Sequence, residues 1–306
     1  MPAAHDADRG PSPRAGAAVR AVADLARSVG LDADGATVVR VGTSVLVGLP
    51  RPGVLARVDD RTPVARVAAQ VAVARALADR DVPAVELVGP GDQPHVVRVE
   101  DRPVAVTLWR WEVLRPGAVD PEDLGALARR LHDGTAGSAA SVAGADPLGA
   151  VADLLASAAG PPADVELLVA EAHRLAPGWA ARVADADPVV HGDLHRDNVL
   201  RTDRGLVLAD LELAGRGPWA YDLAPQVVAQ RRYGAPTAEL AAFLAGYGRP
   251  APGADVLEPL VEIYELWVTA WAVANRHLDD AHEAEAVLRL RRWRAGPDAG
   301  DRWHLR

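Results

Sequence analysis

Apolar and polar residues alternate along the first part of the chain, which is the pattern of strands with one buried face. Two such stretches, residues 37–48 and 53–58, flank the turn-forming run Leu49-Pro50-Arg51-Pro52-Gly53 and predict a β-hairpin. Thr62-Pro63 then starts a helix that runs to about Arg80, with Thr as the N-cap and Pro in the first turn. Further strands are predicted at residues 85–88, 96–99 and 104–108, which makes this part a small α+β unit.

Helical spacing dominates the rest of the chain. The run Asp120-Pro121-Glu122-Asp123 starts a helix that continues to about Gly134, because acidic residues and Pro favour the first turn. Further helices are predicted at residues 147–159, 163–175 and 255–278, with short strands at 189–190, 199–200 and 206–209. The expected organisation is a disordered tail over residues 1–17, an N-terminal lobe over 18–108, a hinge over 109–113 and a C-terminal lobe over 114–306.

Composition removes several kinds of chemistry. The 306 residues include no Cys and no Lys, so all 33 basic side chains are Arg. Thiolate nucleophiles, Cys-bound metals, Schiff-base lysines and the P-loop lysine are therefore excluded. The net charge of −9 disfavours nucleic acid as a partner. Because the chain has neither an apolar run of about 18 residues nor a signal-peptide pattern, we expect a cytoplasmic protein without a membrane partner. The sequence does not indicate the oligomeric state.

The densest polar cluster is His191-Gly192-Asp193-Leu194-His195-Arg196-Asp197-Asn198, which is flanked by the predicted strands at 189–190 and 199–200. Asp210 follows the next apolar stretch. Phosphoryl transfer from ATP needs a carboxylate at the attacking hydroxyl and oxygen ligands for Mg²⁺. Asp193 fits the catalytic carboxylate, and Asn198 and Asp210 fit the metal ligands. The spacing from Asp193 to Asn198 is that of a kinase catalytic loop.

Two other interpretations of this cluster exist. Asp and Asn are common turn formers, so the loop could merely cap itself. That interpretation leaves the flanking strands and the later acid unexplained. The alternation of His191, Asp193 and His195 also resembles metal hydrolase sites. A metallophosphoesterase, however, also needs separate Asp-x-His and Gly-Asn-His-Asp elements, and the sequence has no Gly-Asn-His-Asp element.

The loop, its five-residue spacing and Asp210 resemble the aminoglycoside phosphotransferase family and, more distantly, choline and protein kinases. The run Trp219-Ala220-Tyr221-Asp222-Leu223-Ala224 and the helix Leu124–His132 are also similar to that family. The resemblance implies an α+β, two-lobed, protein-kinase-like fold with a small β-rich N-lobe and a larger, mainly helical C-lobe. It also implies ATP and Mg²⁺ as cofactors, bound where the lobes meet.

The resemblance also places residues around the nucleotide. It implies that Arg57 contacts the ATP phosphates from its strand, that the turn containing Ser44 covers them, and that Thr107 and Trp109 lie at the hinge. Two positions depart from the family. Gln70 stands where a helix Glu usually pairs with the strand cation, and Ser44 often has Asn as its counterpart. Both departures concern how ATP is held.

The resemblance also suggests supporting and acceptor residues. It implies that His191 and Asp222 brace the loop and that Glu212 assists the metal or the acceptor. Three acidic residues share one helix face and could meet a cationic acceptor, although a solvated face is the commoner meaning of such a stripe. Two tryptophans one turn apart could stack on the acceptor or belong to the core. These acceptor candidates are Glu258, Glu262, Glu265, Trp267 and Trp271.

The expected function is ATP- and Mg²⁺-dependent phosphorylation of a hydroxyl on a small molecule such as an aminoglycoside or amino sugar. Antibiotic resistance is one role that such an activity serves. The alternative is a weak or inactive kinase-like binder of nucleotides or metabolites, suggested by Gln70 and Ser44. A protein kinase is disfavoured, because Asp210 and Trp219 leave no room for an activation segment.

Overall fold

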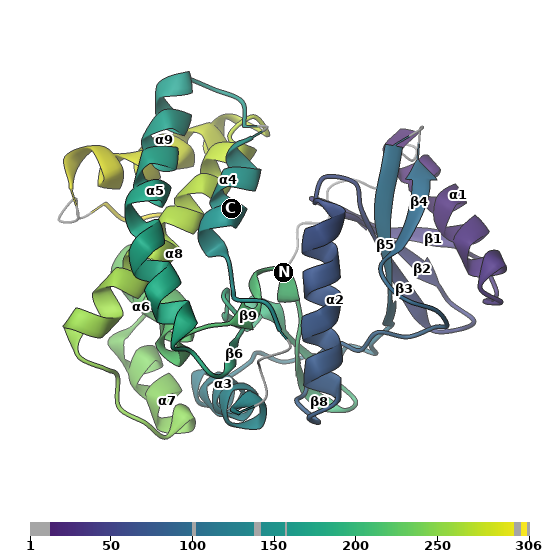
Figure 1. Cartoon of the computed structure of the whole chain (residues 1–306), viewed down its shortest axis with the longest axis horizontal. Helices are drawn as coiled ribbons and strands as arrows, with labels where there is room; N and C mark the ends of the chain where they lie inside the picture. Colours follow the sequence, from purple (N-terminus) through teal and green to yellow (C-terminus); the bar gives the residue numbers. More distant parts are fainter. Residues whose placement is uncertain (1–12, 100–101, 138–141, 157, 297–300, 305–306) are drawn as a thin grey trace. The chain divides into compact units, whose positions relative to one another are not determined.

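The computed structural model describes residues 13–99, 102–137, 142–156, 158–296 and 301–304 (Figure 1). Within it the chain forms two compact units. The first comprises Met1–Arg75 and Val85–Leu114, and the second comprises Ala76–Ala84 and Arg115–Arg306. Among the described residues, no helix is long and apolar enough to cross a membrane.

The first unit is built on an antiparallel sheet. A turn at residues 42–44 divides the predicted strand 37–48 into two strands, and the second of these forms the predicted hairpin with residues 54–59. The strand order is β1-β2-β3-β5-β4. The bounds are β1 (Thr37–Val41), β2 (Val45–Leu49), β3 (Val54–Asp59), β4 (His95–Val99) and β5 (Arg102–Arg110). The register of β2 and β3 places Leu46 opposite Arg57, and that of β3 and β5 places Arg57 opposite Thr107.

One face of this sheet forms the core with helix α1 (Pro13–Ser28). Alternate strand residues, including Val47, Ala56 and Val106, pack there against the Ala-rich face of α1. The helix corrects the expected tail, because residues 13–17 belong to its first turns and Ala15 is buried. Residues 1–12 of that expected tail lie outside the described residues. Helix α2 (Val64–Ala78) lies on the other side of the sheet (Figure 1).

Two further expectations for this unit need correction. Residues 85–88 form no regular strand but a single bridge, Leu87 to Trp109, because Pro83 and the pair Gly89-Pro90 bound the segment closely. Strand β5 continues through Arg110, so the first residues assigned to the hinge belong to the sheet.

The second unit is mainly helical. Its helices are α3 (Pro121–Thr135), α4 (Pro147–Leu155), α5 (Pro162–Ala184), α6 (Ala224–Arg232), α7 (Thr237–Tyr247), α8 (Ala254–Asn275) and α9 (Asp280–Ala295). Two small antiparallel pairs support the polar loop: β6 (Val189–Val190) with β9 (Gly215–Arg216), and β7 (Val199–Thr202) with β8 (Gly205–Leu208). The 3₁₀ turns are η2 (Arg196–Asn198), η3 (Leu211–Leu213) and η4 (Trp219–Leu223). Helix α5 extends beyond its predicted end at residue 175 and contains Pro177 in its interior.

Helices α3 and α7 pack with their backbones almost in contact. A Cβ atom added at Gly125 of α3 would lie 2.0 Å from the carbonyl oxygen of Phe243 in α7. A Cβ at Gly246 of α7 would lie 1.9 Å from the carbonyl oxygen of Glu122. Glycine is therefore required on both helices, although it lowers helix propensity. The pair matters for function because α3 and α7 carry two side chains that hold the polar loop.

We predict that Gly125→Ala lowers the free energy of unfolding by about 1–3 kcal/mol, because the new methyl group forces α3 and α7 apart. Gly16→Ala in α1 is the matched control. The nearest atom to its added Cβ, 3.5 Å away, belongs to the flexible Arg20 side chain. The free energy of unfolding of this variant therefore stays the same or rises by up to about 1 kcal/mol. Urea denaturation measures both. Equal stability of the two variants would contradict the close packing.

Candidate functional site

The polar loop after β6 is held by one buried carboxylate. Asp222, in η4, accepts hydrogen bonds from the backbone N–H groups of His191 and Gly192, both at 2.8 Å. Its Oδ2 also accepts from Nε2 of His132 at 2.9 Å. The other ring nitrogen of His132 lies 2.8 Å from the Tyr247 hydroxyl. Helices α3 and α7 and turn η4 therefore all fix the start of the loop.

His191 and Gly192 have backbone-shaping roles in this loop. The Nε2–H of His191 donates to the carbonyl of Ala209 at 2.8 Å, and its Nδ1 accepts from the N–H of Asp193 at 3.3 Å. Both ring nitrogens are thereby used, which matches a bracing role. Gly192 has φ +84°, and a Cβ there would lie 2.6 Å from the carbonyl oxygen of Leu213. The sharp turn before Asp193 therefore requires glycine.

The Asp193 carboxylate has donors on both oxygens. Its Oδ1 accepts from the Tyr264 hydroxyl at 2.6 Å, and its Oδ2 accepts from Nδ2 of Asn198 at 3.1 Å. Nε2 of His195 lies 3.4 Å from the same Oδ2. Burial would raise the pKa of Asp193, but the hydrogen bond and charge of His195 and the bond from Tyr264 outweigh it and lower this pKa. The carboxylate is thus held as an oriented anion.

The sequence interpretation missed His195 and Tyr264 as neighbours of Asp193. His195 caps η2 and accepts from the N–H of Asp197. Burial opposes its protonation, but Asp193 outweighs burial and raises the pKa of His195. The spacing of two residues between His195 and Asp193 was the only available signal. Tyr264 lies 71 residues away in sequence, and no local pattern indicates this contact.

Asn198 and Asp210 are brought together by the backbone. The N–H of Ala209 donates to the carbonyl of Asn198 at 2.8 Å, so Asp210 follows directly after a residue bonded to Asn198. Nδ2 of Asn198 donates to the carbonyl and to the side chain of Asp193, which leaves its amide oxygen as the group suited to a metal. Asp210 has φ +57° and lies exposed at the start of η3.

This donor set fits Mg²⁺, which takes few protein oxygens and completes its shell with phosphate and water. Among the described residues, no group of three or more His, Asp or Glu side chains is arranged to hold a metal. Glu212 is exposed on η3, close in sequence to Asp210.

In the first unit, Arg57 has a carboxylate partner that the sequence interpretation missed. Its Nε donates to Oδ1 of Asp59 at 3.0 Å, and the two side chains are 14% and 1% exposed. Both residues lie on the same face of β3, because they are two positions apart. Gln70 is buried in α2. Arg57 thus has a carboxylate partner on its own strand.

The turn between β1 and β2, which contains the half-buried Ser44, is anchored by an arginine of α1. Arg14 donates to the carbonyl oxygens of Gly42 at 3.0 Å and Thr43 at 2.9 Å, and its guanidinium also binds Asp60.

On β5, Nε1 of Trp109 donates to the Thr107 hydroxyl at 2.7 Å, and both side chains are buried. The structure therefore brings these two predicted cofactor residues into contact with each other.

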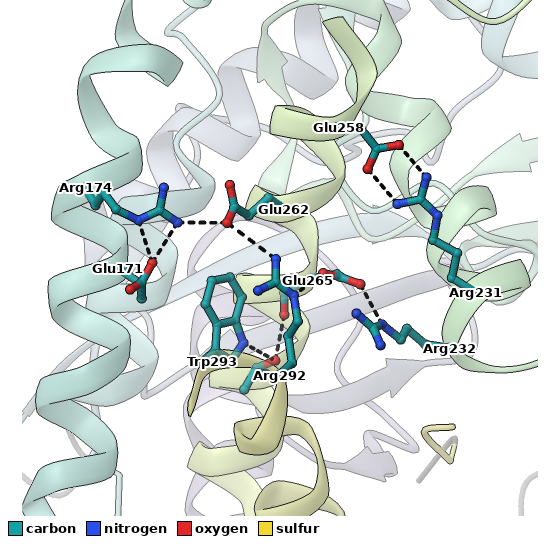
Figure 2. Close-up of polar contacts among 10 residues, drawn as sticks. Glu171, Arg174, Arg231, Arg232, Glu258, Glu262, Glu265, Arg292 and Trp293 are labelled. Carbon is teal, nitrogen blue, oxygen red and sulfur yellow. Dashed lines mark hydrogen bonds and ion pairs between the residues drawn. The ribbon is translucent and has the colours of Figure 1, made fainter. Parts of the chain in front are cut away.

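The acidic stripe on α8 is paired with arginines throughout (Figure 2). Glu258 binds Arg231 of α6. Glu262 binds Arg174 of α5 at 2.8 Å and Arg292 of α9 at 3.4 Å. Glu265 binds Arg232 at 2.7 Å and Arg292 at 2.9 Å. Each carboxylate of the stripe therefore has an arginine partner within the chain, and contact of the stripe with an acceptor stays a prediction.

Of the two tryptophans of α8, one belongs to the core. Trp267 is buried and stacks on Tyr264 with ring centroids 6.1 Å apart, beside the polar loop. Trp271 is half-buried, and its contact with an acceptor stays a prediction.

We predict that Glu265→Gln lowers the free energy of unfolding by about 3–5 kcal/mol, because it removes the buried negative charge that Arg232 and Arg292 both contact. Glu258→Gln is the matched control. Its pair is about half exposed, so the loss is at most about 1 kcal/mol. Chemical denaturation of the two variants tests this. Similar losses of stability in both variants would show that burial does not determine how much each ion pair contributes to the free energy of unfolding.

The two-unit fold and this loop define a protein-kinase-like phosphotransferase. The chain belongs to the phosphotransferase enzyme family, whose pattern it matches over residues 30–260. A search among curated proteins finds no match.

Solved structures of similar fold include three small-molecule kinases. An amicoumacin kinase, solved with AMP-PNP and Ca²⁺, has a TM-score of 0.62 at 13% identity, covering 88% of this chain and 90% of its own. A microcompartment-associated aminopropanol kinase has 0.61 at 19% identity, covering 92% and 98%. An aminoglycoside phosphotransferase of Streptomyces rimosus, solved with ADP and streptomycin, has 0.55 at 22% identity, covering 80% and 98%. At these identities the likeness shows the fold.

Proposed function

We propose that the chain is a small-molecule kinase that transfers the γ-phosphate of ATP to a hydroxyl group. The observation that carries this proposal is the state of Asp193: an oriented anion whose partner Asn198 lies beside Asp210 in the backbone network. A carboxylate next to two oxygen ligands is what phosphoryl transfer from a metal–nucleotide complex requires.

In this proposal Asp193 orients the acceptor hydroxyl and takes its proton as the oxygen attacks phosphorus. The amide oxygen of Asn198 and the carboxylate of Asp210 bind Mg²⁺, which neutralises phosphate charge when bound. In the first unit, Arg57 binds the ATP phosphates, and Asp59 fixes its guanidinium. The Asp59 contact weakens the alternative of an inactive binder, since Arg57 has a carboxylate partner without the helix Glu.

The acceptor class rests on the fold relatives. They are named for amicoumacin, aminopropanol and streptomycin. We therefore propose a hydroxyl-bearing small molecule from the amino alcohols, amino sugars or aminoglycosides. The carboxylates of Glu258, Glu262 and Glu265 already have arginine partners, so an acceptor amino group would share them with those arginines.

We predict that Asp193→Ala lowers acceptor-dependent ADP release by about 10²–10⁴-fold, because the hydroxyl loses its proton acceptor. ADP release from MgATP is measured over a panel of aminoglycosides, amino sugars, sugars and amino alcohols. The affinity for Mg·AMP-PNP is the control and stays within about twofold. Unchanged turnover in this variant would overturn the assignment of Asp193.

We also predict that Asp210→Asn raises the Mg²⁺ concentration for half-maximal turnover by about tenfold or more, because a neutral amide is a weaker ligand than a carboxylate. Asp203→Asn is the control, since Asp203 pairs with Arg115 on the exposed β7–β8 turn. Mg²⁺ titrations at saturating ATP compare the two. An equal Mg²⁺ requirement in both variants would remove Asp210 from the metal site.

A further inference from the structure

Tyr264 is the one residue of α8 whose described hydrogen bond ends on the proposed catalytic carboxylate. We propose that Tyr264 is a positioning residue, and that α8 serves to hold its hydroxyl against Asp193. The inference rests on the proposed function of Asp193 and adds a residue that the loop motif does not contain.

The two oxygens of Asp193 are fixed from different sources. Oδ2 is bonded to Asn198, which belongs to the same loop and moves with it. Oδ1 is bonded to Tyr264, which belongs to a helix far along the chain. A carboxylate rotates readily about its last side-chain torsion, which is broad rather than staggered. The second bond therefore restrains the plane of the carboxylate from an element outside the loop.

The charge state of Tyr264 suits a donor. Burial and the adjacent Asp193 raise the pKa of Tyr264 well above its usual range, so the hydroxyl keeps its proton. Because the hydroxyl donates a hydrogen bond to Oδ1 and stays protonated, Tyr264 does not compete with Asp193 for the proton of the acceptor. Hydrogen bonds to ionised groups are also stronger than neutral ones.

Arginine pairs restrain helix α8 at residues 262 and 265, on either side of Tyr264 in sequence, and Figure 2 shows these pairs. Glu265, the next residue, is held by Arg232 of α6 and Arg292 of α9. Glu262, two residues before Tyr264, is held by Arg174 of α5 and also by Arg292. Three helices thus restrain the segment of α8 that carries the hydroxyl. The acidic stripe anchors the helix, and Tyr264 passes that restraint to Asp193.

The test is Tyr264→Phe, which removes the hydroxyl and keeps the ring stacked on Trp267. Tyr221→Phe is a matched control: this ring packs edge-on against Tyr264, and its buried hydroxyl has no hydrogen-bond partner in the described part of the chain. The readouts are kcat for ADP release, with the best acceptor of the panel or with water, and the Kd for Mg·AMP-PNP.

The proposal predicts a fall in kcat of about 10- to 100-fold for Tyr264→Phe, with the nucleotide Kd unchanged within about twofold. Tyr221→Phe keeps kcat within about twofold. A wild-type kcat for Tyr264→Phe, or equal losses in both variants, would overturn the positioning role. A merely structural role would instead move nucleotide affinity and thermal stability together with kcat.

A crystal structure of Tyr264→Phe decides the inference even if the wild-type protein turns over no acceptor, an outcome that would refute the proposed function alone. We expect the Asp193 carboxylate to be rotated or to occupy more than one conformer in the variant. One unchanged conformer, with Asn198 still bonded to Oδ2, would refute the positioning role.

Discussion

The polar loop that carries Asp193 depends on the buried carboxylate of Asp222. Three donors converge on it: two backbone N–H groups from the start of the loop and one imidazole from α3. A buried carboxylate is stable only when donors satisfy its oxygens, so the same bonds that keep Asp222 in the core also fix the loop. The close packing of α3 on α7 extends this restraint, because Tyr247 of α7 contacts the same imidazole.

Arginine pairs with the other buried carboxylates of the described residues. Having no lysine, the chain pairs buried carboxylates with guanidinium groups, whose several donors can serve two acids at once. Arg292 joins Glu262 and Glu265, and the α8 stripe becomes an internal anchor. In the first unit Arg57 and Asp59 form such a pair within one strand. Carboxylates of α8 that the sequence suggested for ligand binding are thus paired with arginines of the same chain.

The site combines a motif fixed locally with contacts supplied from afar. Asp193, Asn198 and the turn at Gly192 are close in sequence, and the loop bonds among them follow from that closeness. Tyr264 and His132 reach the loop only after α8 and α3 have packed. The loop residues supply the polar groups of the proposed site, and contacts from the helices help to orient them.

Sequence alone determined the hairpin, the helix starts at Pro-containing turns, the kinase-like loop and the spacing of Asp193, Asn198 and Asp210. These features are local, because alternation, capping and turn chemistry act over a few residues. It did not determine that residues 13–17 are helical, that residues 85–88 form only a bridge, or that Glu258, Glu262 and Glu265 are paired with arginines. Those outcomes depend on which residues become neighbours after folding. A charged stripe has the same spacing whether solvent, a ligand or arginines from other helices face it, and only tertiary packing decides between them.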